Sequence, residues 1–165
     1  MKAKVRLTPF EMRTATALAN QRSSDNQSNG VTDRNQSGED KTIEGCAAEL
    51  AVAAALNVYP DLQSGNFKAG DLRMFGDTVD IKWNNGGRYM NCVKWKDKPG
   101  KRCRYYVAVS GTPPDMVIHG WITDRELFQE ANIKDIGNGP YYRFPLNKMH
   151  KFSPYILSGR SSNGL

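Results

Sequence analysis

The sequence predicts a mixed α/β domain in which helices flank a central sheet. Several segments between residues 71 and 122 alternate polar and apolar side chains as strands do. The segment from 44 to 57 is rich in alanine and apolar on every side except at Glu49, as in a helix buried against a sheet. A chain of 165 residues suits one domain with its own core. We expect an N-terminal arm over 1–43, a core over 44–157 and a frayed tail over 158–165.

The N-terminal half carries clear helix signals. Thr8 suits an N-cap, Pro9 suits the first helical position and Glu11 closes a capping box, which predicts a helix ending near Asn20. The segment 21–41 has almost no apolar residue, so we expect a long mobile loop that a ligand or a second subunit would order. A buried helix follows over 44–57, ended by Asn57 and Pro60.

The segment from Asp71 to Trp83 reads as a hairpin with its turn at Gly76-Asp77. This turn sets Asp71 opposite Lys82, Arg73 opposite Asp80 and Phe75 opposite Thr78. Leu72 then faces Ile81 and Met74 faces Val79. One face is wholly apolar and the other holds the charged residues, so the register is self-consistent.

Further strands are expected over 88–95, 104–110 and 116–122, with a weaker strand over 141–146. Two prolines in 111–115 exclude regular structure between the second and third of these strands. Thr123 and Glu126 repeat the capping-box pattern, which predicts a helix from there to about Ala131.

The net charge is +6, and it is concentrated in one segment. Between residues 82 and 104 there are eight basic residues and one acid, Asp97, which gives +7. Such a segment is typical of a polyanion-binding surface, and aromatic rings interleaved with it can stack on bases. A solvated lysine-rich loop beside core aromatics is the equal alternative. The candidate nucleic-acid contacts are Arg88, Lys94, Lys96, Lys98, Lys101, Arg102 and Arg104.

The charged face of the hairpin suggests a metal site. Two carboxylates, Asp71 and Asp80, repel each other unless a cation lies between them, and Mg²⁺ or Mn²⁺ prefers such oxygen ligands. The Ile81 carbonyl would add a ligand, and Glu49 needs a cation or metal if its helix is buried. Lys82 would stabilise charge on a phosphate under attack, so the chemistry is metal-assisted phosphodiester hydrolysis.

Ion pairing is the alternative explanation of the same residues. Asp80 would pair with Arg73 and Asp71 with Lys82 across the strands, and Glu49 would pair with a lysine. The acidic cluster would then be structural.

Three short motifs in this order resemble the PD-(D/E)XK nuclease superfamily: Gly45-Cys-Ala-Ala-Glu49-Leu-Ala, Ala69-Gly-Asp71-Leu and Val79-Asp80-Ile-Lys82. His119-Gly-Trp-Ile122 resembles a later core strand of its small members, so the resemblance covers roughly 44–130. It implies a restriction-endonuclease-like core. It also implies metal binding by Asp71 and Asp80, assistance from Lys82, and Glu49 in the metal shell. A literal Pro-Asp stands at Pro60-Asp61, but the hairpin favours Asp71.

The resemblance implies a Mg²⁺- or Mn²⁺-dependent nuclease acting on duplex, single-stranded or branched DNA. Junction-resolving members are dimers, so a homodimer is a further expectation. The alternatives are a non-catalytic nucleic-acid-binding protein on the same fold, or a protein whose basic surface meets an acidic protein partner. No signal peptide or transmembrane segment is evident, and the three cysteines, 46, 92 and 103, lack zinc-type spacing. We therefore expect a cytoplasmic protein with reduced thiols and no membrane partner.

Overall fold

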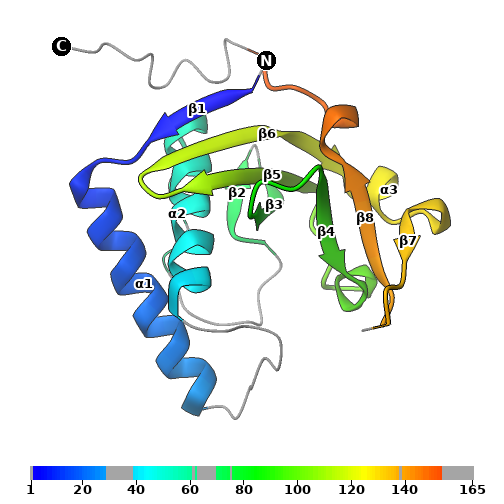
Figure 1. Cartoon of the computed structure of the whole chain (residues 1–165), viewed down its shortest axis with the longest axis horizontal. Helices are drawn as coiled ribbons and strands as arrows, with labels where there is room; N and C mark the ends of the chain where they lie inside the picture. Colours follow the sequence, from blue (N-terminus) through cyan, green and yellow to red (C-terminus); the bar gives the residue numbers. More distant parts are fainter. Residues whose placement is uncertain are drawn as a thin grey trace.

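The computed structural model describes residues 2–28, 39–60, 62, 70–74, 76–137 and 139–153. They form a mixed α/β fold with a curled five-stranded sheet between two other layers (Figure 1). The helices α1 (Pro9–Ser28) and α2 (Glu39–Leu56) cover one face. A second sheet of three short strands covers part of the other face.

The five-stranded sheet has the order β1-β6-β5-β3-β2, and β3 and β5 are its only parallel pair among the described strands. Its strands are β1 (Ala3–Arg6), β2 (Leu72–Met74), β3 (Asp77–Asn84), β5 (Tyr105–Thr112) and β6 (Asp115–Thr123). The second sheet has the order β4-β8-β7, with β4 (Tyr89–Val93), β7 (Ile133–Lys134) and β8 (Tyr141–Pro145).

Alternation along β3 divides its side chains between two cores. Val79 and Ile81 pack in the core under the helices. Asp80 and Lys82 point the opposite way, since successive side chains of a strand face opposite sides. On that side Tyr106, paired with Asp80 in β5, belongs to the core shared with the second sheet. The charged residues of β3 therefore lie between the two sheets.

The first helix begins as expected but is longer than expected. Thr8 and Glu11 form the capping box, with the Thr8 N–H donating to Glu11 at 2.7 Å and the Glu11 N–H donating to Thr8 at 3.3 Å. The expected end at Asn20 is wrong, because α1 continues to Ser28. This polar end of the helix packs against α2 through Arg22, a contact that its own composition does not reveal. Residues 29–38 of the expected loop lie outside the described residues.

The second helix confirms the prediction and begins earlier, at Glu39. Ala47, Ala48 and Ala51 are fully buried, so α2 lies close to the sheet. Asn57 ends the helix with a left-handed backbone at φ 52°.

The hairpin of β2 and β3 exists, but its expected register is wrong by two residues. Leu72 pairs with Val79 instead of Ile81, Arg73 with Thr78 instead of Asp80, and Met74 with Asp77 instead of Val79. Gly76 takes a left-handed φ of 86°, and the turn lies between Met74 and Asp77 rather than at Gly76-Asp77. The expected pairing of Phe75 lies outside the described residues.

A register shift of two keeps every side chain on its expected face, because the period of a strand is two. The shift changes the partners instead. Asp71 lies outside this ladder, since its N–H donates to the Val79 carbonyl at 2.7 Å and its carboxylate accepts from the Ile81 N–H, so it is not paired with Lys82.

The later strands are confirmed as β4, β5, β6 and β8. The link between β5 and β6 is shorter than expected, since only Pro113 and Pro114 separate the two strands. The helix expected to reach Ala131 is wrong in length, since α3 (Asp124–Leu127) is a single capped turn. Asn132 donates its side-chain amide to the carbonyls of Glu126 and Leu127, which ends the helix there. Short 3-10 segments follow β4 (η1, Lys94–Asp97), α3 (η2, Glu130–Asn132) and β8 (η3, Leu146–Lys148).

The edge strand β1 was not expected from the sequence. It pairs with β6, with Ala3 opposite Ile118 and Val5 opposite Met116. Among the described helices, none is long and apolar enough to cross a membrane. The expected tail over 158–165 lies outside the described residues.

Candidate active site

The structure brings Glu49, Asp71, Asp80 and Lys82 together at the open end of the β2–β3 hairpin. Asp71 precedes β2, Asp80 and Lys82 lie on β3, and Glu49 comes from α2. The charges of Glu49, Asp80 and Lys82 all act on the carboxyl group of Asp71. Asp71 thus lies within electrostatic range of the other three residues, although through a register that differs from the expected one.

Asp80 is the most deeply buried member, with 1% of its surface exposed. Its Oδ1 accepts a hydrogen bond from Lys96 Nζ at 2.8 Å, and its Oδ2 forms an ion pair with Lys82 Nζ. Burial alone would raise the pKa of Asp80, but the two ammonium groups outweigh it and lower this pKa. The carboxylate is thus ionised and held between two lysines.

Lys82 remains protonated in this setting. Its ion pair is with Asp80 on the same strand, rather than with Asp71 across the hairpin. Burial works to lower its pKa, but the negative charges of Asp80 and Asp71 raise the pKa above the usual lysine value. Lys82 is therefore a fixed positive charge rather than a base.

Of the three carboxyl groups in this cluster, the one on Asp71 is the least compensated by positive charge. Its Oδ2 accepts a hydrogen bond from the Ile81 N–H at 2.6 Å. Burial, followed by the negative charges of Asp80 and Glu49, raises the pKa of Asp71 to about 7. The N–H and C=O of one strand residue point to the same side, so the Ile81 carbonyl is directed to the side on which Asp71 lies.

Glu49 is 8% exposed and pairs with an arginine of α1. Arg22 Nη1 donates to Oε1 at 2.7 Å, and Arg22 Nη2 donates to Oε2 at 2.8 Å. This bidentate geometry is the strong form of an arginine–carboxylate pair. Burial raises the pKa of Glu49, and Arg22 opposes that rise.

The expected lysine partner of Glu49 is wrong, because Arg22 takes that place. The sequence indicated only that Glu49, if buried, needs a cationic partner. The spacing did not identify which one.

Lys96, like Arg22, has an ion-pair partner that the sequence did not predict. It belongs to the basic segment, where a nucleic-acid contact was expected, yet its ammonium group lies 2.8 Å from Asp80. Its position on η1, directly after β4, brings it over β3 from the second sheet. Arg73, the ion-pair partner first considered for Asp80, is exposed and is not that partner.

The other residues of the expected nucleic-acid surface lie in the loop before β4 and in the segment from η1 to the start of β5. Arg88, Lys94 and Lys98 are exposed, and Lys101 is half-buried. Arg102 pairs with Asp97, and Arg104 pairs with Asp124 at 3.4 Å. Asp97 is already included in the sequence count of +7, whereas Asp124 is not, so the ion pair of Arg104 lowers the net positive charge of this surface below that count.

The donor atoms of this cluster suit a hard divalent cation. Asp71, Asp80 and the Ile81 carbonyl offer oxygen ligands of the kind that Mg²⁺ and Mn²⁺ prefer. Cationic side chains already bind several of these oxygens. Lys96 donates to Asp80 Oδ1, and Arg22 donates to both carboxylate oxygens of Glu49. Across the described residues there is no group of three or more His, Cys, Asp or Glu side chains arranged to hold a metal ion.

The three cysteines lie near this cluster, and Arg22 Nη1 donates to Cys46 Sγ at 3.6 Å. Cys46, Cys92 and Cys103 are free and buried, and burial raises the pKa of each thiol to about 12. His119 and His150 are engaged by Ser110 and Glu126. All three cysteines are unpaired, as expected, and their raised pKa values disfavour the reactive thiolate form.

Comparison of the chain with models of known families, with curated proteins and with solved structures finds no match. Function is therefore inferred from the geometry of the site and from the short motifs.

Proposed function

We propose that this chain is a divalent-metal-dependent nuclease that hydrolyses phosphodiester bonds of DNA on a restriction-endonuclease-like core. One observation supports this above the others. Three carboxyl groups and a protonated lysine, from three separate segments, lie within electrostatic range of one another, and burial and mutual repulsion raise the pKa of Asp71 to about 7. Carboxyl groups perturbed in this way are typical of functional sites.

Each residue then has a defined role. Asp71, Asp80 and the Ile81 carbonyl would hold Mg²⁺ or Mn²⁺, with Glu49 joining them directly or through water. The bound metal would activate a water and polarise the scissile phosphate. Lys82, protonated and anchored by Asp80, would place its positive charge on the phosphate oxygens as they become more negative.

Lys96 connects this site to the basic surface. It takes the place on Asp80 Oδ1 that a metal would need. A metal held by Asp80 would repel the ammonium group of Lys96, which would then be available to a phosphate of the DNA backbone. Lys94 and Lys98, exposed on either side of it, extend the same contact. Cleavage should therefore be sensitive to salt.

The deciding experiment is incubation with supercoiled plasmid, linear duplex, single strands and a four-way junction, in Mg²⁺, Mn²⁺ or EDTA. Asp71→Asn keeps an acceptor for the Ile81 N–H and removes the charge, so it should abolish cleavage. Asp77→Asn, an exposed carboxylate at the start of β3, is the matched control and should cleave as the wild type does. The proposal would be refuted if no substrate were cleaved in a metal-dependent way, or if Asp71→Asn kept full activity.

A second candidate is a non-catalytic nucleic-acid-binding protein. One observation favours it, because Arg22, Lys82 and Lys96 already compensate Glu49 and Asp80 without a metal. This candidate predicts salt-sensitive DNA binding with no turnover. Calorimetry with Mn²⁺ separates the two, since the nuclease requires a metal-binding isotherm that Asp71→Asn loses.

A further inference from the structure

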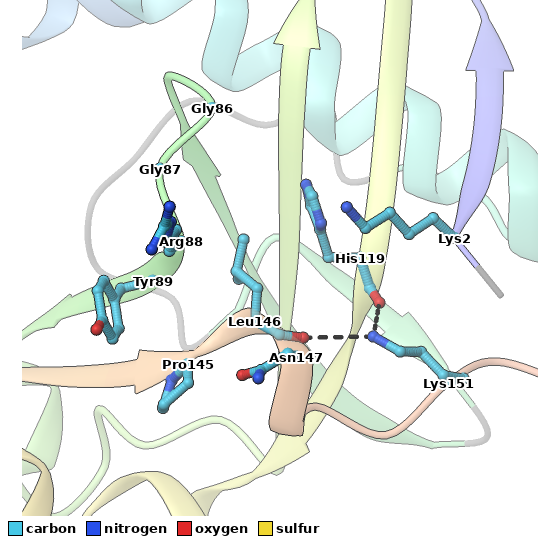
Figure 2. A pocket seen from close by; sticks show the side chains of 10 residues that line it. All are labelled: Lys2, Gly86, Gly87, Arg88, Tyr89, His119, Pro145, Leu146, Asn147 and Lys151. Carbon is cyan, nitrogen blue, oxygen red and sulfur yellow. Dashed lines mark hydrogen bonds between the residues drawn. The ribbon is translucent and has the colours of Figure 1, made fainter.

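A second positively charged site lies away from the Asp80 cluster. A cavity of about 480 Å³ opens between the β3–β4 loop, β6 and the end of β8 (Figure 2). Its lining includes Lys2, Arg88, His119 and Lys151, and no Asp or Glu is among the described residues that line it. Cavities of this size hold small-molecule ligands.

Lys151 is fixed in place without being neutralised. Its ammonium group donates to the carbonyl of His119 at 2.8 Å and to the carbonyl of Leu146 at 3.3 Å, as the dashed lines in Figure 2 show. A lysine ammonium has three donors, so one remains for a ligand. The two carbonyls set the position of the charge, and neither carries a countercharge.

His119 supplies a buried polar atom that lacks a partner. The residue is 7% exposed, and its Nε2 lies 2.7 Å from Ser110 Oγ. Its Nδ1 is buried and has no hydrogen-bond partner among the described residues. When the Ser110 hydroxyl donates to Nε2, Nδ1 carries the ring hydrogen and can donate to an anion. A buried ring nitrogen without a partner costs free energy, and a ligand in the cavity would remove that cost.

The cations of this cavity disfavour one another. Burial, then Lys2, lowers the pKa of Lys151, and burial, then Lys2 and Lys151, lowers the pKa of His119. Positive charges gathered in a concave site without an acid are stabilised by an anion that enters it.

We propose that this cavity binds the phosphate group of a nucleotide, either free or at the end of a nucleic-acid strand. A phosphate offers several strong acceptor oxygens, which can take donors from Lys2, Arg88, Lys151 and His119 together. Part of the remaining wall, with Tyr89 and Pro145, is apolar and suits a sugar or base. A carboxylate side chain would satisfy fewer of these donors.

The cavity shares no residue with the candidate active site, so this inference does not rest on the nuclease proposal. Both nevertheless lie on the same face of the large sheet. Ser110, the partner of His119, lies opposite Asn84, which is two residues beyond Lys82 on β3. If both proposals hold, a strand end anchored here would run toward Lys82.

The test is calorimetry on the full chain in EDTA at low salt, which silences any metal chemistry. The probes are inorganic phosphate, deoxyadenosine, its 5′-monophosphate, and one oligonucleotide with and without a 5′-phosphate. We expect the monophosphate to bind and deoxyadenosine to bind at least tenfold more weakly. Tighter binding of the phosphorylated oligonucleotide than of its unphosphorylated form identifies a strand end as the source. Equal binding of the two oligonucleotides, with the monophosphate still bound, identifies a free nucleotide.

Two double variants distinguish binding in this cavity from a general effect of net charge. Lys2→Gln combined with Arg88→Gln should weaken monophosphate binding about tenfold or more, since two charge-assisted contacts are lost. Lys4→Gln combined with Lys134→Gln changes the net charge equally on exposed residues outside the lining, and should leave the affinity unchanged. No binding of phosphate or monophosphate, equal binding of deoxyadenosine, or an equal loss in the control pair would overturn the proposal.

Discussion

The raised pKa of Asp71 predicts an unusual pH dependence of stability in EDTA. The carboxyl group of Asp71 has a pKa of about 7 in the folded chain, against an ordinary value of 3.8. The folded state therefore binds the proton more tightly than the unfolded state. Its contribution to stability is greatest below pH 3.8 and is lost as the pH rises through 7. At about 1.4 kcal/mol per pKa unit, the full loss is about 4 kcal/mol, of which about 3 kcal/mol falls between pH 5 and pH 8.

Urea denaturation of wild type and Asp71→Asn at pH 5, 6, 7 and 8 measures this contribution. The amide still accepts from the Ile81 N–H but has no proton to lose. The free energy of unfolding of Asp71→Asn, relative to wild type, should rise by about 3 kcal/mol from pH 5 to pH 8. Asp77→Asn, at an exposed position, should give a curve parallel to wild type. Parallel curves for Asp71→Asn would refute the electrostatic reasoning.

Three other variants test separate parts of the structure. Arg22→Met leaves the Glu49 carboxylate buried without its partner and should lower the free energy of unfolding by about 3 kcal/mol. Glu49→Gln in the same chain should recover part of that loss, and additive losses in urea denaturation would contradict the pairing. Gly120→Ala should cost roughly 3 kcal/mol in the same assay, as strained substitutions do. Its new Cβ would lie 2.2 Å from the His150 carbonyl oxygen at a backbone φ of 151°, and an unchanged melting curve would show that the backbone yields there. Lys96→Met should tighten Mn²⁺ binding about tenfold in calorimetry, because the ammonium group that competes for Asp80 is gone. Weaker binding would show that Lys96 supports the metal.

The sequence was most informative where a local pattern decides the structure. The capping boxes at Thr8 and Thr123, the buried helix around Glu49 and the β5–β6 pair all follow from short-range signals. The division of the β2 and β3 side chains between two faces survived an error of two residues in register, because the period of a strand is two.

The partners of the charged residues were not predictable in the same way. Arg22 and Lys96 reach Glu49 and Asp80 through tertiary packing, across 27 and 16 positions of the chain. Neither lies in a local pattern that identifies its partner. Lys96 was instead assigned to a nucleic-acid surface because its neighbours are basic. Long-range pairing of charges is set by the fold, so one sequence carries little information about it.

The strand β1 has a consequence for how the chain reaches its final form. Its residue Ala3 pairs with Ile118, so during synthesis β1 must wait until β6 has been made. Contacts between such distant segments require closure of a long loop, which slows folding. Until β1 adds to the sheet, β6 presents an unpaired edge next to Met116 and Ile118, and an edge of this kind recruits strands from other chains. The strand β1 thus covers an edge of β6 that would otherwise be open to strands of other chains.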